Sequence, residues 1–170
     1  MDPSGHTWSM RDVPPRPPVL SGPVRSFVAA ARTATLATSA SDGRPRLVPI
    51  CFALAPEPDA LGRAVLWSPL DQKPKVSADP HALARVRDLL VLPETTLLVD
   101  RWDEDWTRLA WARLYGRGEL LEPEPREVEE HAAALAALRE KYPQYREQAL
   151  EDRPVIRVVV DRVVTWGATD

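Results

Sequence analysis

The sequence predicts a mainly β protein of the α+β class, a six-stranded antiparallel barrel with peripheral helices. Six segments have the apolar patterns of strands, and most of them follow one another through short, hairpin-like connections. The strands are rich in Val and Leu, which suits a barrel because closure removes exposed sheet edges. We expect one domain over residues 24–170, preceded by a proline-rich extended arm over residues 1–23.

Composition and charge argue against several classes of protein. The chain has 170 residues and a net charge of −3, so it has no overall attraction to nucleic acid. Its single cysteine, Cys51, excludes an intrachain disulfide and fits a reducing compartment. No apolar run approaches the ~20 residues of a membrane span and no signal peptide is visible, so we expect a cytoplasmic protein. Three scattered histidines and one cysteine predict no metal site.

The first elements are a short helix over residues 24–31 and two strands, over residues 33–40 and 45–54. Asp42-Gly43 between the strands is typical of a tight hairpin turn. The second strand is apolar on both faces, as expected for a strand buried on both sides. Pro49 in its middle cannot donate a ladder hydrogen bond, so an edge or a bulge must lie there.

The remaining elements alternate between strands and two helices. Residues 81–91 have Leu and Val at helical spacing, and a glycine kink is expected at Gly116 or Gly118. Further strands are predicted over residues 63–68, 95–100, 107–122 and 154–166.

The clearest helix is predicted over residues 123–142. Pro125 suits its first turn, glutamates fill its N-terminal end, and Pro143 ends it. His131 has no metal-ligating partner one turn away, so we expect it on the surface. The apolar residues expected to face the core are Val128, Ala132, Leu135, Leu138 and Tyr142.

The order of the motifs indicates a family. The chain carries, in succession, "RTATLATSASDGRPRLVPICFAL", "LWSPLDQKPK", "RVRDLLVLPETTLLVD", "DEDWTRLAWARLYGRGELLE" and "KYPQY". This set resembles the FMN-binding split β-barrel superfamily of pyridoxamine 5′-phosphate oxidase-like proteins, and within it the actinobacterial branch of F420-dependent oxidoreductases. The resemblance covers residues 24–166. It implies a homodimer with two equivalent cofactor sites in grooves at the subunit interface.

The resemblance places the cofactor's phosphate at the segment "DQKPK". Lys73 and Lys75 fall where phosphate-binding cations are expected, and Pro74 between them would fix their direction. Arg85 and Arg87 lie on the following helix and could reach the same phosphate or a longer anionic tail; a solvated helix face is an equal alternative.

The resemblance also places the ring system of the cofactor. Val48, Pro49, Ile50 and Cys51 would run along the ring, with backbone groups freed at Pro49 binding its polar edge. Pyridoxamine phosphate oxidases carry an arginine and a lysine on this strand, whereas this chain has Val48 and Ala53 at the nearest positions. This departure argues against FMN binding in its usual form. We expect Cys51 to be a buried structural cysteine rather than a redox thiol.

Three further residues match cofactor contacts in the relatives. Trp67 and Ser68 end a strand just before the lysines, as an aromatic and a hydroxyl that touch the cofactor, although Trp67 is also a plausible core residue. Trp111 would cover the ring or pack in the dimer core.

The function predicted from this resemblance is hydride transfer between coenzyme F420 and a small organic substrate, because the cofactor does the chemistry and the protein supplies binding and orientation. Three alternatives stay open. One is an FMN-dependent oxidoreductase of the same fold. Another is a carrier, storage or sensor protein that binds a flavin or a tetrapyrrole without turnover. The last is a dimeric barrel with no cofactor.

Overall fold

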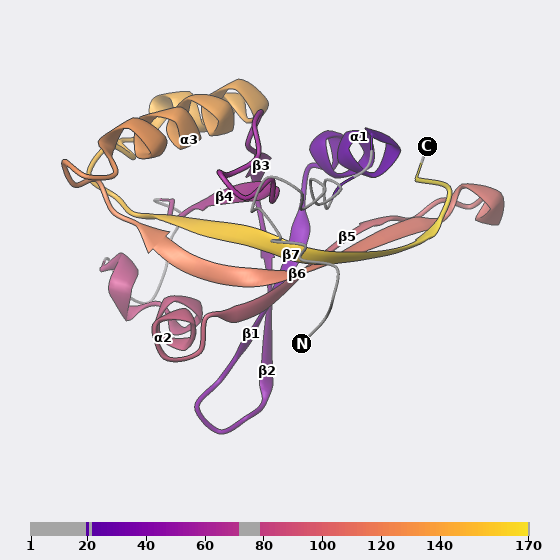
Figure 1. Cartoon of the computed structure of the whole chain (residues 1–170), viewed down its shortest axis with the longest axis horizontal. Helices are drawn as coiled ribbons and strands as arrows, with labels where there is room; N and C mark the ends of the chain where they lie inside the picture. The colour runs from indigo at the N-terminus through magenta and orange to yellow at the C-terminus, as the bar shows by residue number, and fades with distance from the viewer. Residues whose placement is uncertain (1–19, 21, 72–78, 170) are drawn as a thin grey trace, which may run out of the picture.

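The chain forms one curved antiparallel sheet of seven strands, a half-barrel, in a computed structural model that describes residues 20, 22–71 and 79–169. The strand order across the sheet is β2-β1-β5-β6-β7-β4-β3. Figure 1 shows the β1–β2 hairpin crossing the long strands β5, β6 and β7, which extend to one side of the molecule. The strands are β1 (Ala34–Ser39), β2 (Pro45–Ile50), β3 (Ala53–Leu54), β4 (Val65–Pro69), β5 (Glu94–Arg101), β6 (Ala110–Leu121) and β7 (Val155–Gly167).

Three α-helices and several short 3₁₀ turns surround this sheet. No helix in the described ranges has both the length and the apolar character needed to cross a membrane. The helices are α1 (Gly22–Ala30), α2 (Ala84–Val91) and α3 (Val128–Lys141), and the 3₁₀ turns are η2 (Pro80–Ala82), η3 (Trp106–Arg108) and η4 (Pro143–Glu147).

The predicted strand over residues 45–54 is two strands, which is why the sheet has seven strands and not six. β2 ends at Ile50 and β3 begins at Ala53, and these two strands form the opposite edges of the sheet. Two residues, Cys51 and Phe52, therefore join the two edges. The sheet curls until its edges are as close as this link requires. The prediction that Pro49 lies at an edge is confirmed, because β2 pairs with β1 alone.

The apolar core is divided between the two faces of the sheet. One cluster fills the concave side of the half-barrel and includes Leu36, Leu97, Leu114 and Ile156, all less than 2% exposed. The second cluster lies between α3 and the face formed by β4 and the start of β7. The strands β4 and β7 are thus buried on both sides where α3 covers them, which explains their nearly continuous apolar sequences.

The helix predicted over residues 123–142 is shorter and presents a different face. Residues 123–127 form turns before α3 begins at Val128, which is 52% exposed. The predictions for Val128, Ala132 and His131 were therefore wrong. The buried positions of α3 are His131, Ala134, Leu135 and Leu138, and His131 is 4% exposed with Nε2 2.8 Å from the carbonyl oxygen of Arg153. This backbone contact satisfies an imidazole inside the core.

Two glycines have the special geometry that their positions require. Gly43 has a φ of +81° in the hairpin turn between β1 and β2, as the Asp42-Gly43 signal predicts. Gly116 lies at a register shift between β6 and β7, where an added Cβ would be 2.0 Å from the carbonyl oxygen of Val159. The kink expected at Gly116 or Gly118 is therefore a β-bulge at Gly116.

The helix boundaries at the N-terminal side also differ from the prediction. α1 begins at Gly22, so the last residues of the predicted arm belong to this helix. The helix predicted over residues 81–91 is the turn η2 followed by α2, with extended backbone at Leu83 between them. Phe27 and Val28 of α1 are buried and join the concave core.

Candidate functional site

The register of the sheet decides which way the predicted ring-binding residues point. Pro49 pairs with Thr35, which pairs with Leu98, and this row continues through Arg113 to Val164 on the convex face. Side chains alternate along a strand, so the neighbours of Pro49 on β2 point to the opposite, concave face. Val48 packs against the concave core and Ile50 is buried in it. Of these three predicted residues, only Pro49 presents its side chain on the convex face.

The link between β2 and β3 is held by a tyrosine. The hydroxyl of Tyr142, just after α3, accepts a hydrogen bond from the backbone N–H of Phe52 at 3.1 Å. It lies 2.8 Å from the carbonyl oxygens of both Phe52 and Arg32, so its single proton is donated to one of them at a time. Burial raises the pKa of Tyr142. The tyrosine thus connects the link, the start of β1 and the end of α3.

Trp67 and Ser68 do not act as a pair, because they are consecutive strand residues and point to opposite faces of β4. Trp67 is 5% exposed beneath α3, and its Nε1 donates to Glu130 at 3.2 Å. Ser68 is 4% exposed and pairs with Ile156 of the concave core. The core alternative for Trp67 therefore agrees with its position, and the contacts of Trp67 and Ser68 with a cofactor stay predictions.

A buried polar cluster lies where β4 ends. Asp71 is 6% exposed and accepts a hydrogen bond from the hydroxyl of Tyr145 at 3.2 Å. Tyr145 is also within hydrogen-bonding reach of the half-buried Cys51, and burial raises its pKa strongly. Nε of Arg153 donates to the carbonyl oxygen of Leu70 at 2.5 Å. Asp71, Tyr145 and Cys51 therefore bring together the end of β4, the turn after α3 and the link between the sheet edges.

The two arginines of α2 differ in their surroundings. Arg85 is half-buried, and its Nε is a buried donor with no hydrogen-bond partner among the described residues. Burial lowers its pKa, and the carboxylate of Asp71 partly offsets this effect. Arg87, which is also predicted to bind the cofactor, is exposed. The predicted phosphate-binding residues Lys73 and Lys75, with Pro74, lie outside the described residues.

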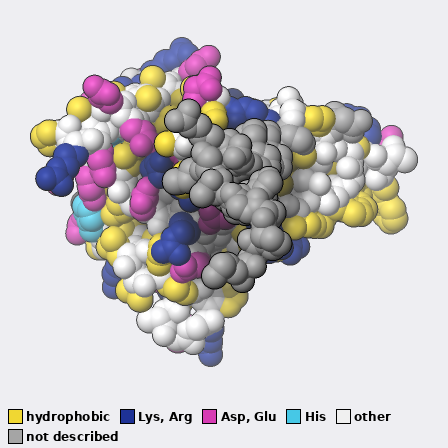
Figure 2. All heavy atoms as spheres, in the orientation of Figure 1, with side chains coloured by type: hydrophobic (Ala, Val, Ile, Leu, Met, Phe, Trp, Pro, Cys, Tyr) yellow, Lys and Arg dark blue, Asp and Glu magenta, His cyan; other side chains and the backbone are white. Residues whose placement is uncertain are grey.

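Aromatic and cationic side chains occupy the convex face where the strands project beyond the barrel. Trp111 of β6 lies directly opposite Trp166 of β7, which is 54% exposed. The guanidinium of Arg113 lies 5.0 Å from the ring centroid of Trp111, and its Nη1 donates to the hydroxyl of Tyr115 at 3.0 Å. The guanidinium of Arg162 lies 4.0 Å from the ring centroid of Tyr115. In Figure 2, hydrophobic side chains also gather at the end of this projection.

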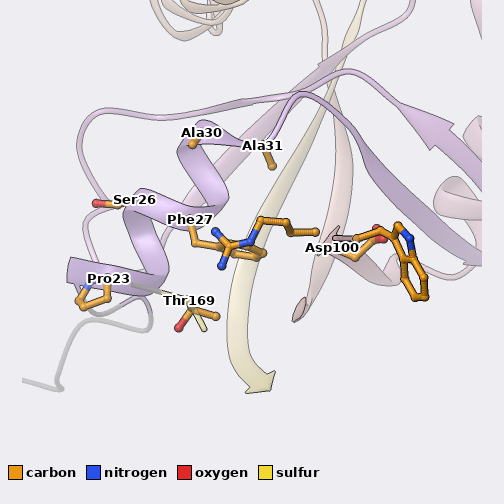
Figure 3. Close-up of a pocket in the computed structure, with 9 residues that line it drawn as sticks. Pro23, Ser26, Phe27, Ala30, Ala31, Asp100 and Thr169 are labelled. Atoms are coloured by element: carbon orange, nitrogen blue, oxygen red, sulfur yellow. The ribbon is translucent and has the colours of Figure 1, made fainter. Parts of the chain in front are cut away.

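The largest described hollow contains none of the predicted site residues. It has a volume of about 870 Å³ between α1, the end of β5 and the C-terminal residues, and Figure 3 shows Phe27, Asp100 and Thr169 around it. Arg101 lines this hollow and donates to the carbonyl oxygens of Arg108 and Ala168, so its guanidinium group is already hydrogen-bonded to the backbone. The exposed Trp102 borders the same hollow.

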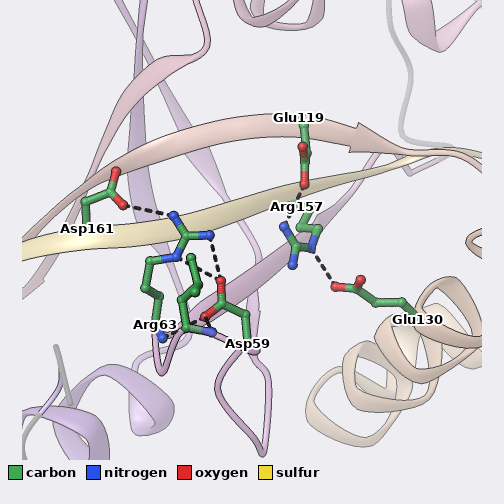
Figure 4. Close-up of polar contacts among 7 residues, drawn as sticks. Asp59, Arg63, Glu119, Glu130, Arg157 and Asp161 are labelled. Carbon is green, nitrogen blue, oxygen red and sulfur yellow. Dashed lines mark hydrogen bonds and ion pairs between the residues drawn. The ribbon is translucent and has the colours of Figure 1, made fainter. Parts of the chain in front are cut away.

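A second network of charged groups stabilises the convex face under α3. Arg157 is bonded to Glu130 at 2.7 Å and to Glu119 at 2.6 Å, and Arg63 pairs with Asp59 at 2.8 Å (Figure 4). The carboxylates keep the guanidinium of Arg157 charged despite its burial and raise its pKa. Both arginines have carboxylate partners, whereas the Nε of Arg85 has no hydrogen-bond partner among the described residues.

The structure thus separates the predicted site residues that it describes. Cys51 lies in the cluster with Asp71, Pro49 and Trp111 lie on the convex face, and Trp67 lies beneath α3. The others are Val48, Ile50 and Ser68 inside the barrel and the exposed Arg87 on α2. Sequence reasoning missed Asp71, Tyr145 and Lys141, a half-buried lysine whose Nζ has no hydrogen-bond partner among the described residues. The motif "KYPQY" contains Lys141 and Tyr145, but no pattern in the sequence linked it to the residues after β4.

The half-barrel closed by a two-residue link places the chain in the class of split β-barrel proteins. The chain belongs to the pyridoxamine 5′-phosphate oxidase family, whose model matches residues 20–167. It has no match among the curated proteins.

Solved structures with the same fold have different functions. A conserved hypothetical protein, Rv2991, from Mycobacterium tuberculosis has 22% identity and a TM-score of 0.63 over 92% of this chain and 91% of its own. A heme binding protein from Mycobacterium smegmatis has 22% identity and a TM-score of 0.60 over 86% of this chain and 53% of its own. An F420 reductase has 19% identity and a TM-score of 0.55 over 82% of this chain and 94% of its own. At these identities the similarity concerns the fold alone.

Proposed function

We propose that this protein is a homodimeric oxidoreductase that binds coenzyme F420 and transfers a hydride between it and a small organic substrate. The observation that carries the proposal is the buried Nε of Arg85 near Asp71, which has no hydrogen-bond partner among the described residues. A buried guanidinium donor without an acceptor is unfavourable, so an anionic ligand group would complete it. Asp71 directly precedes the segment with Lys73 and Lys75, which the same phosphate would recruit.

The described residues fit a phosphorylated ring cofactor in two respects. Arg85 would bind the phosphate, since guanidinium groups bind phosphate oxygens through two parallel hydrogen bonds. Pro49 and the Cys51–Phe52 link would lie along the ring, on the side where the proline leaves the edge of β2 without a donor. When bound, the cofactor supplies the two-electron hydride chemistry, and the family and the F420 reductase with the same fold support this choice.

The dimer is proposed from the uncovered convex face. Trp166 and Val164 are exposed there beside the half-buried Trp111. Val164 belongs to the row of paired residues that continues across the sheet to Pro49. Aromatic and arginine side chains are enriched in protein interfaces. A second copy on this face would bring its Trp111 toward Pro49. Trp166→Ser should therefore shift the mass measured by sedimentation equilibrium toward the monomer, whereas Leu61→Ser, at an exposed loop residue, should not. A monomeric wild-type protein would refute the dimer.

The cofactor is tested by fluorescence titration of the full chain with F420 and, separately, with FMN. We expect F420 to bind and Arg85→Met to weaken it at least ~10-fold, because hydrogen bonds to charged groups are worth ~1.5–3 kcal/mol. Arg44→Met removes the same charge from an exposed position in the β1–β2 turn and is the matched control. Equal losses in both variants would indicate a general charge effect and refute the assignment to Arg85. The double variant Lys73→Ala/Lys75→Ala tests the phosphate site predicted from the sequence.

FMN is the second candidate cofactor, favoured by the family match itself. Binding of FMN alone would move the protein to an FMN-dependent reaction on the same site. Binding of either cofactor without any change of its redox state in the presence of acceptors would support a carrier or sensor.

A further inference from the structure

The last residue of α3, Lys141, has no hydrogen-bond partner for its ammonium group in the part of the chain that the structure describes. Its Nζ is buried, and no described residue accepts from it. Two aromatic faces lie close to it: Nζ lies 4.2 Å from the ring centroid of Phe52 and 5.7 Å from that of Tyr142. An ammonium has three N–H donors, and aromatic faces attract its charge without accepting these hydrogen bonds fully. The amine is therefore held at the Cys51–Phe52 link with its donors unsatisfied.

The charges around Lys141 do not compensate it either. Arg32, between α1 and β1, repels the ammonium, while Cys51 from the link favours it. Burial is the largest effect, and together they lower the pKa of Lys141 to about 8. None of the carboxylates with described ion pairs is paired with this lysine. A positive charge is thus held beside the segment along which the ring is proposed to lie.

We propose that Lys141 sets the redox preference of the bound cofactor: its ammonium stabilises the negative charge that a flavin or deazaflavin ring carries when it is reduced. A ring that accepts a hydride gains an electron pair, and a cation near its polar edge favours that form over the oxidised one. The inference rests on the proposed function, since it requires a ring cofactor at the link. The inference goes beyond that function by naming the group that makes the protein bind the reduced cofactor more tightly than the oxidised one.

The test compares the affinities of the oxidised and the reduced cofactor. Titrations under anaerobic conditions give both dissociation constants for wild type, Lys141→Met, Lys141→Arg and Arg146→Met. In Lys141→Met, we expect the preference for the reduced form to fall ~10-fold, a shift of ~30 mV for a two-electron couple. Lys141→Arg should restore most of it. Arg146→Met removes an exposed charge just beyond α3 and should leave the preference unchanged.

The stability of the free protein separates this role from a structural one. If Lys141 is retained for a ligand, removal of its buried charge should leave the melting temperature of Lys141→Met equal to or above that of wild type. A lower melting temperature with an unchanged redox preference would show that the contacts with Phe52 and Tyr142 are its purpose, and would overturn the inference. An unchanged preference alone overturns it too. If wild type binds neither F420 nor FMN, the proposed function fails, and this inference fails with it.

Discussion

The hydroxyl of Tyr142 should contribute more to stability than its single side chain suggests, because it closes the half-barrel. Tyr142→Phe keeps the ring, which packs edge-on against Tyr145 at 5.5 Å between centroids and under the guanidinium of Arg32 at 4.5 Å. It removes the only oxygen that the buried N–H of Phe52 is described as using, at 3.1 Å. The substitution therefore isolates the polar connection between the sheet edges from the packing around it.

The expected cost follows from the donor left behind. A buried N–H that loses its acceptor costs ~1–3 kcal/mol, and we expect ~2 kcal/mol here. For a chain of this length, that loss corresponds to a fall in melting temperature of ~4–8 °C. The assay is urea unfolding followed by far-UV circular dichroism at one fixed protein concentration, with an unchanged dependence on urea.

The matched control is Tyr115→Phe. That tyrosine donates no described bond to buried backbone, and its hydroxyl accepts from the exposed Arg113. Its loss should change the free energy of unfolding by less than ~0.5 kcal/mol. Equal effects of the two substitutions, or a cost below ~0.5 kcal/mol for Tyr142→Phe, would refute the view that this hydroxyl holds the link.

Three further predictions concern the free energy of unfolding, measured in the same assay. Asp88→Ala should cost ~2–4 kcal/mol, because this buried carboxylate accepts from a threonine of β1 and an arginine of β2, each at 2.8 Å; a cost below ~1 kcal/mol would contradict it. Gly116→Ala should cost more than ~3 kcal/mol or prevent folding, since its Cβ would meet backbone of Val159, whereas Gly22→Ala has open space and should be nearly neutral. Lys141 has a native pKa of about 8, below its ordinary value of 10.5, so the unfolded chain binds more protons between these pH values and wild-type stability should rise across them. The pH-dependent advantage of Lys141→Met, up to ~3 kcal/mol at pH 7, should therefore disappear by pH 10.5; an advantage that does not change with pH would contradict the burial of a charged amine.

The elements that the sequence predicted well are those with local signals. The β1–β2 hairpin depended on Asp42-Gly43, and the bulge depended on a glycine inside an apolar strand. The division of residues 45–54 into β2 and β3 had no such signal. Both halves are apolar, and the break at Cys51 and Phe52 exists because the two edges of a curled sheet must meet.

The candidate site was less predictable because its members depend on tertiary contacts. Trp67 and Ser68 are adjacent in sequence, and only the position of α3 shows that the tryptophan lies beneath a helix. Arg85 and Arg87 are equivalent by composition and spacing. Their difference arises from the way α2 lies on the sheet, which buries one guanidinium and exposes the other. His131 was expected on the surface, but its contact with the carbonyl oxygen of Arg153 lets the imidazole be buried.

The two-residue link also sets a length. Between Ile50 and Ala53 the chain makes three steps, which span at most ~11 Å when fully extended. The gap between the two edges of the sheet is therefore limited by covalent geometry and cannot widen by the breaking of weak contacts. One residue inserted at Cys51-Phe52 would lengthen this tether by ~3.5 Å, which makes it the most direct way to engineer the width of the split for a bulkier ligand.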